Sequence, residues 1–548
     1  MTVRPLHGVL LAAVLLAGAA LREHVVQSIP GFFGPSDPAI YFGMGRGVLR
    51  DGIPRQDFIH HFLSRPRTIA HVEDYYEPLY AYPVALAMAL GGGTPAAAAQ
   101  SSVVFGVLAI VVVWALARRH GPIAALAAAA IVTFEPWAIY YSGVLMKEAL
   151  VCVLAPGFLW FARREIEREA PAWSTGLRLA LATVAAGLFQ YEILPILGIA
   201  VAVTLGLRRR SALPAYALAA SALVAGLVAG TWIATGVPLS AKFLYFLGHV
   251  PGDPEPPTVV RGLDLSVRSL LPLEFIARTL LLSWYPLVLF LGLAGLFAAR
   301  TPAVERTLTL TFLGAYLYLH AIPVDLWNRD FIPLTFVLAP PAAAALTGGA
   351  WRERRALAAG AWAMLFFLWG APSTVAALGA WSRAVRAWGM WPKLGLGAGL
   401  ALAGLGLGLA LARTRAGGWL QRVTPLLLAT SLAAGYWEML PYPSIWANSQ
   451  YPDFEVERAR RERVGHWMKE TVAPGAVLAA KPEEIAYYSG FPAVVMPDTF
   501  HPGSVARLAA RYRLRYLLVE PGAMPDSVLG TLPVRPLGER EGCRLFAF

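Results

Sequence analysis

The sequence has few charged residues and almost no cysteine. Only 15% of its 548 residues are Asp, Glu, Lys or Arg, whereas 57% are hydrophobic, and the mean hydropathy is +0.55. This balance excludes an ordinary soluble protein and indicates an integral membrane protein. The two cysteines, Cys152 and Cys543, fall too far apart in the predicted topology to pair, so we expect no disulfide bond.

Several catalytic motifs are also absent. The chain has no His-Glu-x-x-His, Gly-x-Ser-x-Gly or Cys-x-x-Cys sequence, which excludes zincin, α/β-hydrolase and thiol redox chemistry. The glycine-rich run 395–408 lacks the ending of a phosphate-binding loop, and its small-residue spacing favours helix packing. Arginines of the short loops account for most of the net charge of +12, which is therefore a topology signal with a weak role at membrane lipid headgroups, and no groove of basic and aromatic residues suggests a nucleic-acid partner.

Long apolar stretches recur along the chain. A segment of about 20 apolar residues crosses the hydrocarbon core as a helix, because a helix satisfies its own backbone polar groups there. We therefore expect a polytopic α-helical membrane protein with about thirteen transmembrane helices. Their approximate centres are 8–21, 96–117, 122–139, 148–162, 175–189, 193–207, 213–235, 278–298, 307–321, 331–348, 356–371, 394–412 and 421–436.

Arginines in the short loops predict the orientation. They all fall on one side of the expected membrane, which the positive-inside rule assigns to the cytoplasm of a cell inner (plasma) membrane. The loops 22–95, 140–147, 237–277 and 320–330 then lie outside, with everything after about 437. The first segment ends in Ala17-Gly18-Ala19 and could be a cleaved signal peptide, but we favour an uncleaved span.

The composition changes after the last expected span. Residues 1–440 form the expected membrane domain, including the external loop 22–95, and residues 451–548 a small external (periplasmic) α/β domain. Its expected helices and strands are the amphipathic segment 455–471, the apolar runs 476–480, 493–496 and 516–519, and the helical stretches 483–488 and 504–513. Tyr487, Tyr488 and His501 could contact a substrate there, although packing and surface roles are favoured.

Acidic residues gather in the external loops. Asp37 opens a short amphipathic helix, Glu77 precedes a second helix that ends near Leu90 and is too short to span, and Glu148 stands at the external start of a span. Carboxylates are costly to keep at a membrane surface, so they are usually functional there.

These segments resemble the GT-C superfamily of polytopic glycosyltransferases, which includes protein O-mannosyltransferases and the aminoarabinose transferase of lipid A. The resemblance rests on the order of weak motifs along nearly the whole chain. They are Asp-Pro-x-x-Tyr at 37–41, Glu-Pro-Leu-Tyr at 77–80, Tyr-Ser-x-x-x-Met-x-Glu at 141–148, Asn-Arg-Asp-Phe-Ile-Pro at 328–333, and Trp467, 486–490 and 516–519 in the C-terminal domain. Glu77 stands where the aminoarabinose transferases have a lysine.

The resemblance implies a transferase that uses a polyprenyl-phosphate-linked sugar and a protein, lipid or glycan acceptor. A carboxylate can take the proton of an attacking hydroxyl group, and we assign this general base to Asp37; the alternative is that Asp37 only caps a helix. Glu148 would orient the acceptor, and Glu77 would lie close by.

The leaving phosphate requires cations, and Arg329 is the candidate by family position. The expected substrate-binding residues are Tyr41, Arg46, Tyr80, Tyr141, Lys147 and Arg329. We expect no obligatory metal or other cofactor, although a divalent metal is possible, and His60-His61 beside Asp57 is too small a group to predict a metal site.

A transporter or flippase of lipid-linked sugars is the main alternative. Such a protein would be expected to carry ionisable residues inside its spans, near the midplane. The expected spans are nearly free of charge, and the carboxylates cluster in external loops. The enzyme interpretation is therefore favoured, and a scaffold without catalytic function would leave the loop chemistry unexplained.

Overall fold

The computed structural model describes residues 5–29, 37–60, 66–73, 76–235, 285–298, 301–321, 332–348, 454–496 and 502–548. Arg329, His501, the loop 237–277 and the expected spans 356–371, 394–412 and 421–436 lie outside these residues. Within them, every expected span coincides with a helix or a pair of helices.

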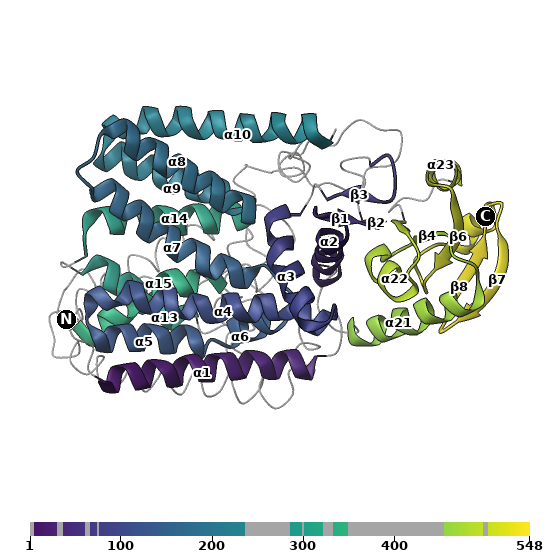
Figure 1. Cartoon of the computed structure of the whole chain (residues 1–548), viewed down its shortest axis with the longest axis horizontal. Coiled ribbons are helices and arrows are strands. Elements are labelled where there is room, and N and C mark those ends of the chain that lie inside the picture. Colours follow the sequence, from purple (N-terminus) through teal and green to yellow (C-terminus); the bar gives the residue numbers. More distant parts are fainter. Residues whose placement is uncertain are drawn as a thin grey trace, which may run out of the picture.

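These helices lie nearly side by side (Figure 1). They are α1 (Pro5–Ser28), α4 (Pro95–Ala117), α5 (Pro122–Thr133), α6 (Pro136–Gly143), α7 (Glu148–Glu167), α8 (Ala172–Phe189), α9 (Ile193–Arg208), α10 (Leu213–Thr235), α13 (Tyr285–Phe297), α14 (Ala303–Ala321) and α15 (Ile332–Gly348). In the described part of the chain, 4 helices are long and apolar enough to cross a membrane, or 5 if the bent pair α5 and α6 forms one span. The predicted number of spans, about thirteen, stays a prediction.

The bend between α5 and α6 measures 62°. It occurs at Glu135-Pro136, where the proline has no N–H to continue the ladder of helical hydrogen bonds. Glu135 accepts a hydrogen bond from the backbone N–H of Ala138 and so caps α6. The expected span 122–139 is therefore broken close to its end.

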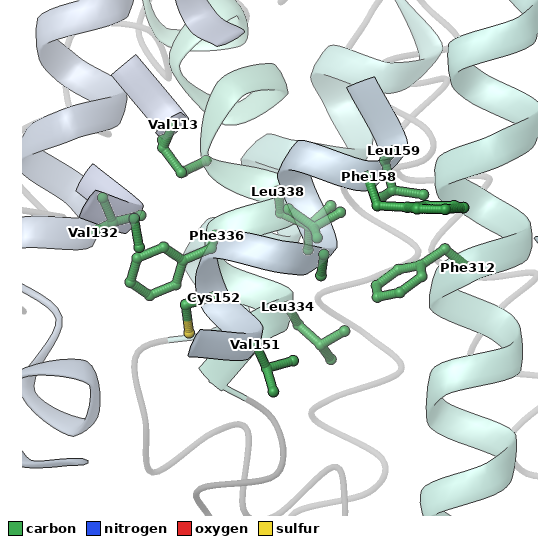
Figure 2. Close-up of a cluster of buried hydrophobic side chains, with 14 of the residues drawn as sticks. Val113, Val132, Val151, Cys152, Phe158, Leu159, Phe312, Leu334, Phe336 and Leu338 are labelled. Atoms are coloured by element: carbon green, nitrogen blue, oxygen red, sulfur yellow. The ribbon is translucent and has the colours of Figure 1, made fainter. Parts of the chain in front are cut away.

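The core of the bundle consists mainly of Ala, Leu, Val and Ile. Figure 2 shows Phe336 and Leu338 of α15 among side chains from α4, α5 and α7. Gly295 of α13 lies so close to α15 that a Cβ atom would come within 2.0 Å of the carbonyl oxygen of Pro341. Small residues thus permit the close packing that membrane helices require. Cys152 is also buried in this core, and neither cysteine is bonded.

Arginines meet at the end of the bundle where α4 and α7 end and α14 begins. Arg119 and Arg163 both pair with Glu305, the latter at 2.9 Å between Nη1 and Oε2. Arg209 donates hydrogen bonds to backbone carbonyls of the α7–α8 connection. The short arginine-bearing loops, which the sequence assigns to one side of the membrane, therefore lie together in the structure.

The first loop lies at the other end, between the bundle and the C-terminal domain (Figure 1). It contains α2 (Asp37–Asp51), β1 (Arg55–Gln56), β2 (Phe58–Ile59), β3 (His71–Val72), the 3-10 helix η1 (Pro78–Tyr80) and α3 (Ala81–Gly91). The two short helices expected there are present, and their buried faces pack against each other and against α4. Gly47 of α2 allows close contact with β1, since a Cβ atom would lie 2.2 Å from the carbonyl oxygen of Arg55.

The C-terminal residues form an α/β unit, as expected. Its elements are α21 (Phe454–Thr471), β4 (Ala476–Ala479), α22 (Pro482–Ser489), β5 (Ala493–Val495), α23 (Pro502–Tyr512), β6 (Leu514–Val519), α24 (Asp526–Leu529), β7 (Arg535–Arg540) and β8 (Cys543–Ala547). The sheet has six strands in the order β2-β5-β4-β6-β8-β7. Strands β2, β5, β4 and β6 are parallel, and β8 and β7 are antiparallel additions that the sequence did not predict.

Candidate functional site

Asp37 is the first residue of α2 and is almost completely buried. Its Oδ1 atom accepts a hydrogen bond of 2.7 Å from the hydroxyl group of Tyr76. Tyr76 lies in the segment before η1, 39 residues further along the chain. This hydrogen bond connects the start of α2 to the segment before η1.

Tyr41 lies one helical turn after Asp37 and is fully buried. Its ring makes edge contacts with Tyr76 and Tyr80, at centroid distances of 5.4 and 4.9 Å. Burial raises the pKa of Tyr41 well above its ordinary value, and the negative charges of Glu77, Asp37 and Glu148 raise it further. The negative charges of the three carboxylates that the sequence singles out thus all act on this one phenol.

The hydroxyl group of Tyr41 has no hydrogen-bond partner among the residues that the structure describes. A buried hydroxyl group without a partner is costly, so such groups normally bind water or a ligand. Tyr41 is therefore well suited to contact a substrate, as the sequence predicts.

Glu77 takes part in a buried ion pair. Lys147 Nζ lies 3.1 Å from its Oε1 atom and 3.4 Å from its Oε2 atom, and the backbone N–H of Tyr191 donates to Oε1 at 3.3 Å. Lys147 also lies 3.7 Å from Glu192 Oε2. The pair connects the first loop to the start of α7 and to the α8–α9 connection.

Glu148 begins α7, next to this ion pair, and lines an open pocket. Glu192 lies on the same pocket and accepts a hydrogen bond of 2.7 Å from Gln190. The remaining lining residues come from α7, α9, α14 and α15: Val151, Ile193, Ile196, Tyr316 and Pro333. The pocket thus combines apolar side chains with two acidic groups.

The other predicted binding residues have different surroundings. Tyr80 donates a hydrogen bond of 2.9 Å to the carbonyl oxygen of Met146, and burial raises its pKa. Tyr141 stacks on Trp137 inside the bundle, at 5.8 Å between ring centroids. Arg46 is exposed on α2, and its charge opposes the rise in the pKa of Tyr487 that burial causes. The predicted roles of Tyr80, Tyr141 and Arg46 in substrate binding stay predictions.

The sequence did not single out Tyr76, Glu192 or His60 as site residues. Glu192 could have been predicted from the sequence, since residues 190–192 form a polar segment between two apolar ones. His60 is buried, which lowers its pKa to about 3, and its Nδ1 atom is 3.9 Å from Glu73 Oε2. Asp57 pairs with Arg50 instead, at 2.8 Å. Over the described ranges, no group of three His, Cys, Asp or Glu residues could hold a metal ion.

Comparison with known proteins gives one family match. Residues 76–233 match the model of the family described as dolichyl-phosphate-mannose-protein mannosyltransferase. The matched segment contains Glu77, Lys147, Glu148 and Glu192, and it begins after Asp37. No curated protein sequence is significantly similar to the chain.

Solved structures share the fold over the whole chain. Crystal structures of ArnT from Cupriavidus metallidurans, in the apo state and bound to undecaprenyl phosphate, both have a TM-score of 0.57 and 16% sequence identity, and cover 98% of this chain and 97% of that chain. The Archaeoglobus fulgidus oligosaccharyltransferase is also similar, with a TM-score of 0.46 and 13% identity over 94% of this chain and 69% of that chain. The chain thus matches this family's model over residues 76–233 and shares its fold with ArnT.

Proposed function

We propose that this chain transfers a sugar from a polyprenyl-phosphate-linked donor to a hydroxyl acceptor at the external face of the inner membrane. The observation that carries the proposal is the buried carboxylate of Asp37, which accepts a hydrogen bond from Tyr76, together with the buried ion pair of Glu77 and Lys147. A related fold, ArnT, binds undecaprenyl phosphate, which supports a lipid donor of this class. The acceptor is a hydroxyl group of a protein, a lipid or a glycan.

In the proposed step, the acceptor oxygen attacks the anomeric carbon of the sugar. Its proton passes to the carboxylate of Asp37, which acts as general base. The bond between the anomeric carbon and the phosphate oxygen breaks, and the polyprenyl phosphate leaves with the electron pair. Lys147 and Arg329 are the proposed cations for the negative charge that develops on the phosphate.

Glu77 and Glu148 have supporting roles in this proposal. Glu77 holds Lys147 at the site through the buried ion pair. Glu148 faces the open pocket, where it would orient the acceptor. No metal is required for these steps, so transfer should continue in the presence of a chelator.

The test is transfer of radiolabelled sugar from a panel of undecaprenyl-phosphate-linked hexoses and pentoses to extracted envelope material. Membranes carry the native chain, Asp37→Asn or Asp51→Asn at matched expression. Asp51 is exposed on the same helix and paired with Arg50, so it is the matched control. We expect the native chain and Asp51→Asn to transfer label, and Asp37→Asn to lose about 10²–10⁴-fold in rate.

Two outcomes would contradict the proposal. Equal transfer rates for the native chain and Asp37→Asn would show that Asp37 is not the general base and has only a structural role. Activity that is lost in chelator and restored by Mg²⁺ or Mn²⁺ would contradict the metal-independent mechanism.

A transporter of lipid-linked sugars is the second candidate. One observation favours it: Arg22 of α1 is fully buried in the bundle, and its charge acts on Glu135 at the bend before α6. Intramembrane charges often mark a transport path. Absence of transfer from every donor, together with movement of a labelled donor across reconstituted vesicles, would establish this function instead.

A further inference from the structure

The sheet of the C-terminal domain contains a strand from the first loop. Strand β2 pairs in parallel with β5, with Phe58 beside Ala493 and Ile59 beside Val494. Ile59 is 1% exposed and belongs to the hydrophobic core of the C-terminal domain. More than four hundred residues of sequence separate the two strands, so this pairing is a tertiary contact between the first loop and the C-terminal domain.

Two further contacts hold the loop on either side of β2. On one side, Phe42 of α2 packs against Tyr487 of α22, at 5.2 Å between ring centroids. On the other side, the hydroxyl group of Tyr512 donates to the carbonyl oxygen of Pro66 at 2.8 Å. The C-terminal domain therefore fixes the position of the loop at several points.

The residue that follows β2 reaches the candidate site. His60 is buried, and its ring lies 5.3 Å from the ring of Tyr76. The backbone N–H of Tyr76 donates to Glu73 Oε1 at 3.2 Å, and the N–H of Glu73 donates to the carbonyl oxygen of Pro54 at 2.9 Å. These contacts hold Tyr76 against the part of the loop that pairs with the C-terminal sheet. The hydroxyl group of Tyr76 in turn donates a hydrogen bond to Asp37.

We propose that Tyr76 is a positioning residue for Asp37, and that the C-terminal domain keeps it in place through β2 and His60. This inference rests on the proposed function, in which Asp37 is the general base. The hydrogen bond fixes the orientation of the carboxylate and stabilises its ionised form. Because a displacement of about 1 Å at a reacting group can cost about 10²-fold in rate, such positioning has a large kinetic effect.

The proposal predicts a change in pH dependence as well as in rate. Removing a donor to a carboxylate raises its pKa, so the variant needs a higher pH to be active. The titratable groups that face Asp37 are Tyr76 and Tyr41, with His60 at longer range. Glu77 and Glu148 face Tyr41 from the segment before η1 and from α7.

The test uses the full chain with Tyr76→Phe, which removes the hydroxyl group and keeps the ring contacts. We expect kcat to fall about 10- to 100-fold with a smaller change in KM for the acceptor, and the acidic limb of the pH profile to move to higher pH. In the Asp37→Asn background, Tyr76→Phe should cause no further loss, because both changes act on the same carboxylate. The matched control is Tyr82→Phe, since Tyr82 is exposed in the neighbouring helix α3 and should leave rate and profile unchanged.

A second variant, His60→Ala, leaves Tyr76 itself intact and removes the ring that packs on it. It should shift the pH profile in the same direction by a smaller amount. A native pH profile and rate in both variants would overturn the inference. If the native chain transfers sugar and Asp37→Asn does not, such a result would leave the proposed function standing; absence of transfer by the native chain would refute the proposed function itself.

Discussion

The three carboxylates of the candidate site differ in what surrounds them. Asp37 accepts a hydrogen bond from a phenol, Glu77 has both oxygens near the ammonium group of Lys147, and Glu148 lines an open pocket. A carboxylate in a buried ion pair is a poor proton acceptor, because protonation removes the negative charge that pairs with the buried lysine. The ion pair with Lys147 therefore disfavours Glu77 as the base, although all three are the same kind of group.

His60 should make the stability of the protein depend on pH. Its pKa in the folded protein is about 3, against an ordinary value of 6.5, because burial disfavours the charged imidazole. Between these two pKa values, His60 binds a proton in the unfolded chain but not in the folded chain. The free energy of unfolding is therefore highest above pH 6.5 and decreases as the pH falls toward 3. The groups near His60 are Glu73, His71, Asp37 and Tyr76.

The measurement is the melting temperature of the purified chain in detergent between pH 7 and pH 4. His60→Phe keeps an aromatic ring against Tyr76 and cannot be protonated, so its melting temperature should fall less steeply than that of the native chain. His466→Phe is the control, because His466 is exposed on α21. Parallel curves for the native chain and His60→Phe would contradict the prediction.

Among the elements, α21 is anchored to the C-terminal sheet by buried charge. Arg461 is 4% exposed, and its guanidinium group lies within 3.4 Å of Glu484 and 3.0 Å of Glu520. Burial raises the pKa of Glu484 to about 7, although Arg461 opposes the rise. Removing the arginine would leave the buried Glu484 without this ion pair and Glu520 with Arg460 at 3.6 Å, and removing one partner of a buried ion pair is strongly destabilising.

Arg461→Leu should therefore destabilise the C-terminal domain by about 3–5 kcal/mol. The matched control is Arg463→Leu on the same helix, since Arg463 pairs with Glu541 at the surface. Pulse proteolysis of the full chain in increasing urea measures the effect. Equal urea midpoints for the two variants would show that the buried network contributes no more than the surface pair.

At the scale of the whole molecule, the first loop joins the helical bundle to the C-terminal domain. Helices α2 and α3 pack on α4, whereas β2 completes the edge of the C-terminal sheet. A short edge strand contributes few backbone hydrogen bonds, so the burial of Phe58 and Ile59 is a main part of what holds it in place. Asp37, the candidate base, thus lies in the loop that connects the helical bundle to the C-terminal domain.

Ile59→Lys should release this loop, because the lysine would bring a charge into the core of the C-terminal domain. Cleavage of the loop by a protease should become roughly tenfold faster or more, since 1.4 kcal/mol already corresponds to a factor of ten. Ile53→Lys is the matched control in the same loop, where the side chain is 40% exposed. Equal cleavage rates in both variants would show that β2 does not hold the loop.

Local patterns were enough to predict most of the helices and strands. Residues 193–208 and 454–471 show why: the first is apolar throughout, the second is amphipathic, and each property depends only on neighbouring residues. Strand β7 was missed because its residues are mostly exposed or polar, and strand β8 because its apolar run Leu545–Ala547 is only three residues long. Strand β2 was missed because two residues carry no periodicity.

By itself, the sequence determined the membrane class, the helices in the described part of the chain, the α/β character of the C-terminal residues and the identity of the acidic candidates. Only the tertiary structure decided which of these residues meet. Tyr76 reaches Asp37 across 39 residues, and Lys147 reaches Glu77 across 70. The physical reason is that hydropathy and helix periodicity are local properties, whereas a hydrogen bond or an ion pair between distant residues depends on how the helices and the sheet pack together.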